Sequence, residues 1–119
     1  MSGNVIAEWE MVGGENGTAR YFADPTTTRK KAVKAKMWTL FALPTPEVLG
    51  NRKPFLSVMS QHEFDCNEEQ VRILYMTFHS ADMGRGEIVE TIESPDAAWS
   101  PVRPNSVNNS NMQVACRSQ

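Results

Sequence analysis

The sequence is 119 residues long, with 40% hydrophobic and 22% charged residues and a formal net charge of −2. A chain of this length buries about two-thirds of its unfolded surface, so it can form one domain with its own core. The slight negative charge argues against bulk attraction to nucleic acid, and no apolar run approaches the roughly eighteen residues that a membrane span needs. We therefore expect a single domain over residues 1–119, without a transmembrane segment and without nucleic acid as a partner.

The first strand is expected over residues 4–12, where apolar side chains alternate with neighbours of the opposite face. Asn16-Gly17 follows, and an Asn-Gly pair between apolar runs is a strong hairpin signal. Residues 18–23 are then the partner strand. The Asp-Pro-Thr-Thr-Thr run of residues 24–28 predicts either a single capped helical turn or an Asx-type turn.

The middle of the chain predicts two more strands, over residues 32–43 and 55–66, both with period-two alternation. Pro44 and Pro46 are expected to end the first of them, because proline cannot donate to a strand ladder. The second is more polar and is expected to be half exposed.

Residues 70–79 and 87–92 predict a further hairpin, because β-branched and aromatic residues alternate in them. Gly84 and Gly86 in the connection can adopt the positive φ angles of a tight reversal. Unbroken alternation would place one set of side chains on one face of the first strand and the rest on the other. The first set is Val71, Ile73, Tyr75, Thr77 and His79; the second is Arg72, Leu74, Met76 and Phe78.

The C-terminal segment predicts a short helix over residues 107–116, with Asn105 or Ser106 at its cap. Its asparagine-rich body has poor helix propensity, so packing and a crosslink are needed to hold it. Six antiparallel strands and one terminal helix predict an α+β domain in which the helix covers one face of the sheet.

Cys66 and Cys116 are the only cysteines in the sequence, and their separation excludes a CxxC redox motif or a zinc knuckle. A disulfide would tie the end of a strand to the terminal helix and explain how a poor helix stays docked. We therefore predict the bond, and with it an exported protein. The alternative is two unrelated buried thiols in a cytosolic protein. No signal peptide is recognisable, so an exported chain would have its targeting segment outside this sequence.

The sequence offers no pattern for catalysis or metal binding. His62 and His79 lie on different predicted strands, without the spacing that brings metal ligands together. There is no G-x-S-x-G motif, and the two glycines of the hairpin connection are too few for a phosphate loop. We expect no catalytic residue, no metal and no cofactor.

One group of basic residues is the candidate binding site. It consists of Arg29, Lys30, Lys31, Lys34 and Lys36. A cationic surface of this kind can bind an acidic protein or polymer, and the alternative is a solvated face that keeps a sheet edge unpaired. Trp9, Trp38 and Trp99 are expected to pack on the sheet, with an exposed aromatic platform as the alternative.

Several short elements recur in a fixed order: the Trp9 strand, residues 21–24, the strand around Trp38, residues 63–66, the Tyr75 strand, Gly84-x-Gly86, and residues 99–106 before Cys116. In these elements the chain resembles the surface-adhesin protein E-like family of bacterial exported domains. The resemblance implies an antiparallel sheet with a terminal helix held by one disulfide. It also implies a product in the periplasm, at the outer membrane or on the cell surface.

The resemblance favours a non-enzymatic binding or structural domain of the bacterial envelope, adhesin-like in function. The best-known member binds host matrix and serum proteins, but many relatives belong to bacteria without a host. The alternatives are a small periplasmic enzyme or a ligand-binding accessory module, and a cytosolic housekeeping domain. A deep pocket with convergent polar groups would favour the enzyme or accessory module.

Overall fold

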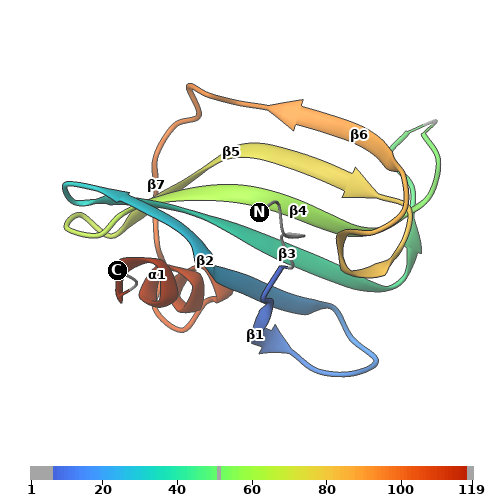
Figure 1. The fold of residues 1–119 in the computed structure, drawn as a ribbon, viewed down its shortest axis with the longest axis horizontal. Coiled ribbons are helices and arrows are strands. Elements are labelled where there is room, and N and C mark those ends of the chain that lie inside the picture. The colour runs from blue at the N-terminus through green and yellow to red at the C-terminus, as the bar shows by residue number, and fades with distance from the viewer. Residues whose placement is uncertain (1–6, 51, 118–119) are drawn as a thin grey trace, which may run out of the picture.

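The computed structural model describes residues 7–50 and 52–117, which form a curved antiparallel sheet and a C-terminal helix (Figure 1). Six strands follow one another across the sheet in chain order. They are β1 (Glu10–Gly14), β2 (Arg20–Lys31), β3 (Lys34–Glu47), β4 (Phe55–Asp65), β5 (Gln70–His79) and β6 (Ile88–Glu93). The short β7 (Ser100–Pro101) pairs with the start of β5, and α1 (Val107–Arg117) ends the fold. The predicted α+β class is confirmed.

The two ends of the first predicted hairpin differ from expectation. β1 begins at Glu10, and residues 4–6 of the predicted strand lie outside the described residues. The run from Asp24 to Thr28 forms no helical turn: it belongs to β2, where the pairing with β3 shifts between Asp24 and Arg29. Asp24 Oδ1 does accept a hydrogen bond from the Thr26 amide (3.0 Å), so the Asx-type contact forms inside an irregular strand.

The prolines after residue 43 interrupt a ladder but do not end a strand. β3 continues through Pro44 and Pro46 to Glu47. Its regular pairing with β4 stops at Ala42, and beyond the irregularity Glu47 is aligned with Phe55. A proline can keep an extended backbone although it cannot donate, so the predicted end of this strand was too early.

A bulge in β5 changes the predicted alternation of its side chains. Tyr75 is aligned with Gln61 and Ile73 with His62, which leaves Leu74 as an extra residue. Side chains on the two sides of the bulge therefore exchange faces. Ile73 and Met76 line the same hollow, although unbroken alternation would put them on opposite faces of the strand.

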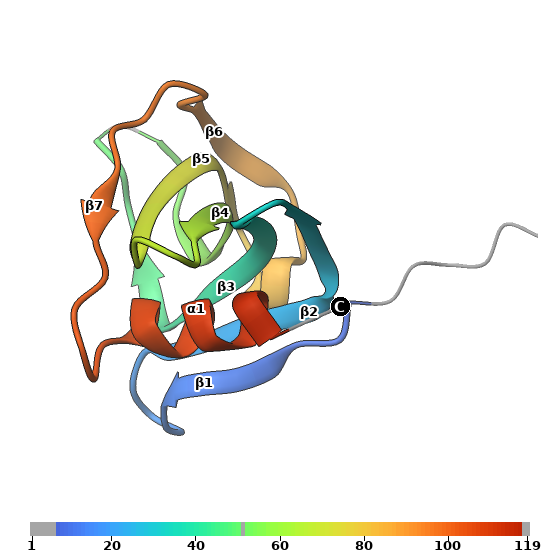
Figure 2. The same cartoon turned by 90° about the vertical axis from the view of Figure 1, so that its left-hand side faces the viewer.

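The helix α1 packs on the inner face of the curved sheet, as Figure 2 shows from the side. Met112 and Ala115 of α1 are buried against side chains of β2 to β5. Those sheet residues are Ala23, Ala35, Met37, Phe64 and Val71. Because this packing removes apolar surface from water, it stabilises a helix whose own propensity is poor.

Both ends of α1 are held by further contacts. Ser106 Oγ accepts a hydrogen bond from the Asn109 amide (3.1 Å), which confirms the predicted N-cap. The predicted disulfide between Cys66 and Cys116 is also confirmed, with a Cα–Cα distance of 5.8 Å. It joins the end of β4 to the last turn of α1.

The opposite, outer face of the sheet is covered only in part. Phe22, Leu40 and Ala42 form a buried cluster there, against which Trp9 and Met83 pack. Met83 belongs to the 3₁₀ turn η1 (Asp82–Gly84), where Gly84 has a φ of 74°, as the predicted reversal requires. Within the described residues, no helix is both long enough and apolar enough to cross a membrane.

The three tryptophans pack on the sheet, but none is fully buried. Trp9 is half-buried beside the cluster of the outer face, and Trp38 is half-buried edge-on to Tyr75 with 5.8 Å between ring centroids. Trp99 is half-buried too. Trp9 and Trp38 thus pack on the sheet as peripheral contacts and not as core residues.

Candidate functional site

The predicted basic residues line one groove of about 420 Å³ on the β2–β3 hairpin, here called the basic groove. Strand pairing brings them together, because Arg29 is aligned with Lys36 and Lys31 with Lys34. Lys30 also lines the groove, and Glu63 of β4 is the acidic residue of its lining. The chain reversal after Lys31 thus converts a basic run in the sequence into a compact cationic surface.

Cations that face each other across two strands repel one another. Directly opposed like charges destabilise a strand pair, and the hairpin contains two such pairs, Arg29–Lys36 and Lys31–Lys34. All four residues are exposed, so water and salt weaken the repulsion. An acidic partner in the groove would convert this repulsion into attraction.

Several members of the groove already have partners in the fold, among them Arg29, which donates to the Thr28 carbonyl (2.9 Å). Lys30 Nζ donates to the Cys116 carbonyl (2.8 Å), where a cation also interacts favourably with the C-terminal end of α1. Glu63 is buried and pairs with Arg72, whose Nη2 lies 2.8 Å from Glu63 Oε1. Because Arg72 holds this carboxylate, Glu63 neutralises the groove less than a free glutamate would.

An aromatic ring lies next to the basic groove. Lys34 Nζ is 5.9 Å from the centroid of the Trp99 ring, and the Arg72 guanidinium is 4.5 Å from it. Cations over an aromatic face are held by the ring quadrupole. Trp99 therefore orients Lys34 beside the groove and offers apolar surface to a partner there.

The two histidines lie apart and have different environments. His79 Nε2 is 2.7 Å from Thr77 Oγ1, and burial lowers the pKa of His79. His62 lines a hollow between the sheet and α1, and burial lowers its pKa from 6.5 to about 4, opposed in part by a hydrogen bond with the Ser60 backbone. Over residues 7–50 and 52–117, no three His, Cys, Asp or Glu side chains converge as metal ligands would.

The hollow beside His62, here called the inner cavity, was not predicted from the sequence. It has a volume of about 470 Å³ and lies between the inner face of the sheet and the first turns of α1. Its apolar lining is Tyr21, Leu40, Phe41, Phe55, Val58, Ile73, Met76, Phe78 and Val107. Its polar lining is Thr39, Glu47, Ser60, His62, Ser106, Asn108 and Asn111.

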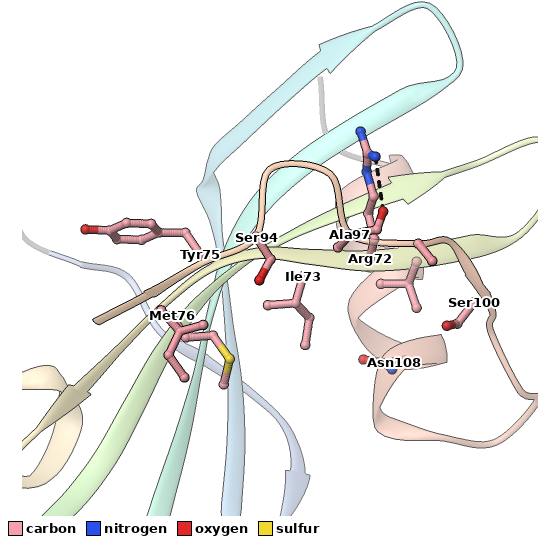
Figure 3. A pocket seen from close by; sticks show the side chains of 11 residues that line it. Arg72, Ile73, Tyr75, Met76, Ser94, Ala97, Ser100 and Asn108 are labelled. Atoms are coloured by element: carbon pink, nitrogen blue, oxygen red, sulfur yellow. Dashed lines mark hydrogen bonds between the residues drawn. The ribbon is translucent and has the colours of Figure 1, made fainter. Parts of the chain in front are cut away.

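A smaller hollow of about 340 Å³ adjoins the inner cavity and shares Ile73, Met76 and Asn108 with it. Figure 3 shows Ile73 and Asn108 facing each other across this hollow, with Arg72 on the far side of β5. The Arg72 guanidinium donates to the Ala97 carbonyl (3.3 Å), which ties the segment before β7 to β5. The alternation of β5 alone could not have revealed the hollow, because the bulge at Leu74 sets which side chains line it.

The sequence matches the family model described as surface-adhesin protein E over residues 9–117. A crystal structure of protein E from non-typeable Haemophilus influenzae has a TM-score of 0.64 at 12% identity, over 81% of this chain and 68% of that one. A second crystal form of Haemophilus influenzae protein E has a TM-score of 0.68 at 11% identity, over 94% of this chain and 96% of the other. At these identities the two structures show a shared fold. No curated protein matches the sequence.

Proposed function

Because this chain belongs to the surface-adhesin protein E family, we propose that it is a non-catalytic, exported binding domain of the bacterial envelope. It holds an acidic surface, of a protein or of a polymer, in the basic groove. The observation that carries this proposal is the alignment of Arg29 with Lys36 and of Lys31 with Lys34 on one exposed hairpin. The Cys66–Cys116 disulfide supports export, because such bonds persist in oxidising compartments.

The chemistry of the groove suits weak, salt-sensitive binding. Each exposed ion pair contributes about 0–1 kcal/mol, so several must form together to hold a partner. The groove offers up to five cations, and Lys31 and Lys36 form no ion pair or side-chain hydrogen bond within the described chain. These two side chains can bind an acidic group without breaking a contact of the fold.

The test is a charge reversal with a matched control. The double variant Lys31→Glu/Lys36→Glu should bind a heparin-like polymer about tenfold more weakly at low salt, which corresponds to the loss of two modest ion pairs. The control Lys53→Glu/Arg103→Glu changes the net charge by the same amount outside the groove. It should leave most of the affinity in place. The same measurements with candidate matrix proteins ask whether a protein partner uses this surface.

Two results would contradict the proposal. Equal weakening by the two double variants would mean that net charge matters and the groove does not. Unchanged binding by Lys31→Glu/Lys36→Glu, with the circular dichroism spectrum of the folded protein, would remove the groove as the binding site.

A further inference from the structure

The walls of the inner cavity are aromatic and apolar. Phe55 and Phe78 meet edge to face with 5.0 Å between ring centroids, and Tyr21 stacks on Phe41 at the same separation. Ligand sites for small molecules have volumes of about 300–1,000 Å³, mostly apolar walls and a few placed polar groups. The inner cavity meets each of these conditions, with a volume of about 470 Å³.

His62 presents an acceptor to the inner cavity. The Thr39 hydroxyl donates to the Ser60 carbonyl (3.4 Å), so its oxygen can accept from His62 Nδ1, which is 3.1 Å away. That arrangement places the ring proton of the neutral imidazole on Nδ1 and leaves Nε2 with a lone pair.

Asn111 supplies a second acceptor in the lining of the same cavity. Its side chain lines the cavity and is only 3% exposed, yet its Oδ1 has no hydrogen-bond partner in the described part of the chain. A buried polar atom without a partner is unfavourable, so native proteins rarely leave one unless a ligand or water completes it. Asn111 Oδ1 thus requires a donor, and His62 Nε2 can accept one.

The charges around the inner cavity select a neutral ligand. Glu47, at the exposed rim, carries the negative charge of the lining, and no lysine or arginine among residues 7–50 and 52–117 lines the cavity. His62 is neutral near pH 7, because burial keeps its pKa low. An anion would meet no cation here, and any charged group would lose its hydration without a partner.

We propose that the inner cavity binds a small, neutral aromatic molecule that carries a hydrogen-bond donor, of the phenol or indole class. The ring packs against Phe41, Phe55 and Phe78, and its O–H or N–H donates to His62 Nε2 or to Asn111 Oδ1. This site uses none of the basic residues of the groove.

The test compares ligands that differ in one hydrogen bond. Phenol, its methyl ether anisole and the anion benzoate are titrated into the ¹⁵N-labelled protein, and the amide shifts are followed by NMR. Phenol should bind with a dissociation constant of about 1 mM or below, as its few atoms allow, and shift the amides of Ile73, Met76 and Asn108. Anisole, which lacks the donor, should bind about tenfold more weakly, and benzoate weaker still.

Two substitutions locate the acceptor. Asn111→Leu and His62→Phe keep the approximate size of each side chain and remove its acceptor. In at least one of them the preference for phenol over anisole should disappear while anisole still binds. Asn109→Leu is the matched control, because Asn109 lies in the same helix outside the inner cavity and should keep the preference.

Three outcomes would overturn this inference. They are equal affinity for phenol and anisole, shifts confined to the β2–β3 hairpin, and a preference for phenol that survives both substitutions. If neither variant folds, the comparison of phenol with anisole in the unmodified protein decides the question.

Discussion

The basic groove carries its polar groups on exposed side chains, whereas the inner cavity holds a few polar atoms that water hardly reaches. In the groove, Lys31 and Lys36 are exposed and have no ion-pair or hydrogen-bond partner among the described residues, and water solvates their charge. In the cavity, Asn111 and His62 are buried, and Asn111 Oδ1 has no partner in the described part of the chain, which is unfavourable. One surface therefore offers many weak and salt-dependent contacts, and the other offers few contacts of greater strength.

The difference between the groove and the cavity arises because α1 covers one face of the strands and leaves the other face exposed at the groove. Lys36 and Met37 are neighbours on β3, but Lys36 is exposed in the groove while Met37 is buried beneath α1. Strand alternation alone thus separates the two environments by one residue. Since α1 and the sheet enclose the cavity together, changes at α1 should affect the cavity strongly and the groove weakly.

The largest expected effect comes from the disulfide. Replacing both cysteines by alanine, Cys66→Ala/Cys116→Ala, reopens a loop of 50 residues. The chain-entropy model then gives a loss of about 4 kcal/mol in the free energy of unfolding, measurable by urea denaturation. Because α1 bears one wall of the cavity, binding of phenol should be lost before binding of a polyanion.

The disulfide prediction has a simple control. The unmodified protein treated with reductant should behave like the double variant, and its mass should rise by two hydrogens. Two freely alkylatable thiols in folded, oxidised protein would contradict both the bond and the argument for export.

The second prediction concerns pH and His62. The folded protein binds a proton at His62 only near pH 4, whereas the unfolded chain binds it near pH 6.5. His62 therefore makes its full contribution to the free energy of unfolding above pH 6.5. As the pH falls toward 4, this contribution decreases by about 3 kcal/mol. Urea denaturation at a series of pH values should show this slope, and His62→Gln should reduce it. An unchanged slope in His62→Gln would mean that other groups, His79 among them, cause the pH dependence of the free energy of unfolding.

A smaller effect is expected from Asn111. Replacing it by leucine removes a buried oxygen without a partner and adds apolar contact with the cavity wall. We expect Asn111→Leu to raise the free energy of unfolding by about 1 kcal/mol, because the desolvation cost of the amide disappears. Thermal denaturation of Asn111→Leu, with Asn109→Leu as the control, measures this change in stability. A loss of stability specific to Asn111→Leu would show that the amide is satisfied in the protein, for example by water.

The smallest prediction concerns the cations of the groove. Lys31→Glu converts the Lys31–Lys34 pair into one of opposite charge. Cross-strand pairs of opposite charge contribute about 0.2–1 kcal/mol, so this variant should be slightly more stable at low salt. The gain should shrink in high salt, which screens exposed charges. Lys53→Glu, which breaks the Lys53–Glu87 pair, should instead be slightly less stable at low salt.

The sequence allowed most of the strands and the disulfide to be predicted, because both rest on local signals. Period-two alternation located β4 and β5, and Ser106 before a docked helix located α1. Local signals predicted the Asx-type contact at Asp24 but not the strand that contains it. They also missed the bulge at Leu74, because pairing with a neighbouring strand, not propensity, sets the backbone there. Bulges arise from the register of two strands, which no single segment encodes.

The basic groove and the inner cavity also differ in how far the sequence predicts them. The basic groove was predictable as a cluster, because its five residues lie within eight positions of one another. The inner cavity was not, because His62, Asn111 and Phe78 come from different elements that meet only in the folded chain. No local signal marked His62 as a binding residue, and Asn111 had only one unusual local feature, its low helix propensity.

The most direct test of the proposed binding function is a salt titration of polymer binding. The affinity of the unmodified protein and of Lys31→Glu/Lys36→Glu for a heparin-like polymer is measured over a range of salt concentrations. If the groove holds an acidic partner, the affinity of the unmodified protein falls steeply as salt rises, because screening weakens its exposed ion pairs. The variant then binds more weakly at every concentration and shows a shallower dependence. Binding that does not depend on salt, or that the variant retains in full, would contradict the proposal.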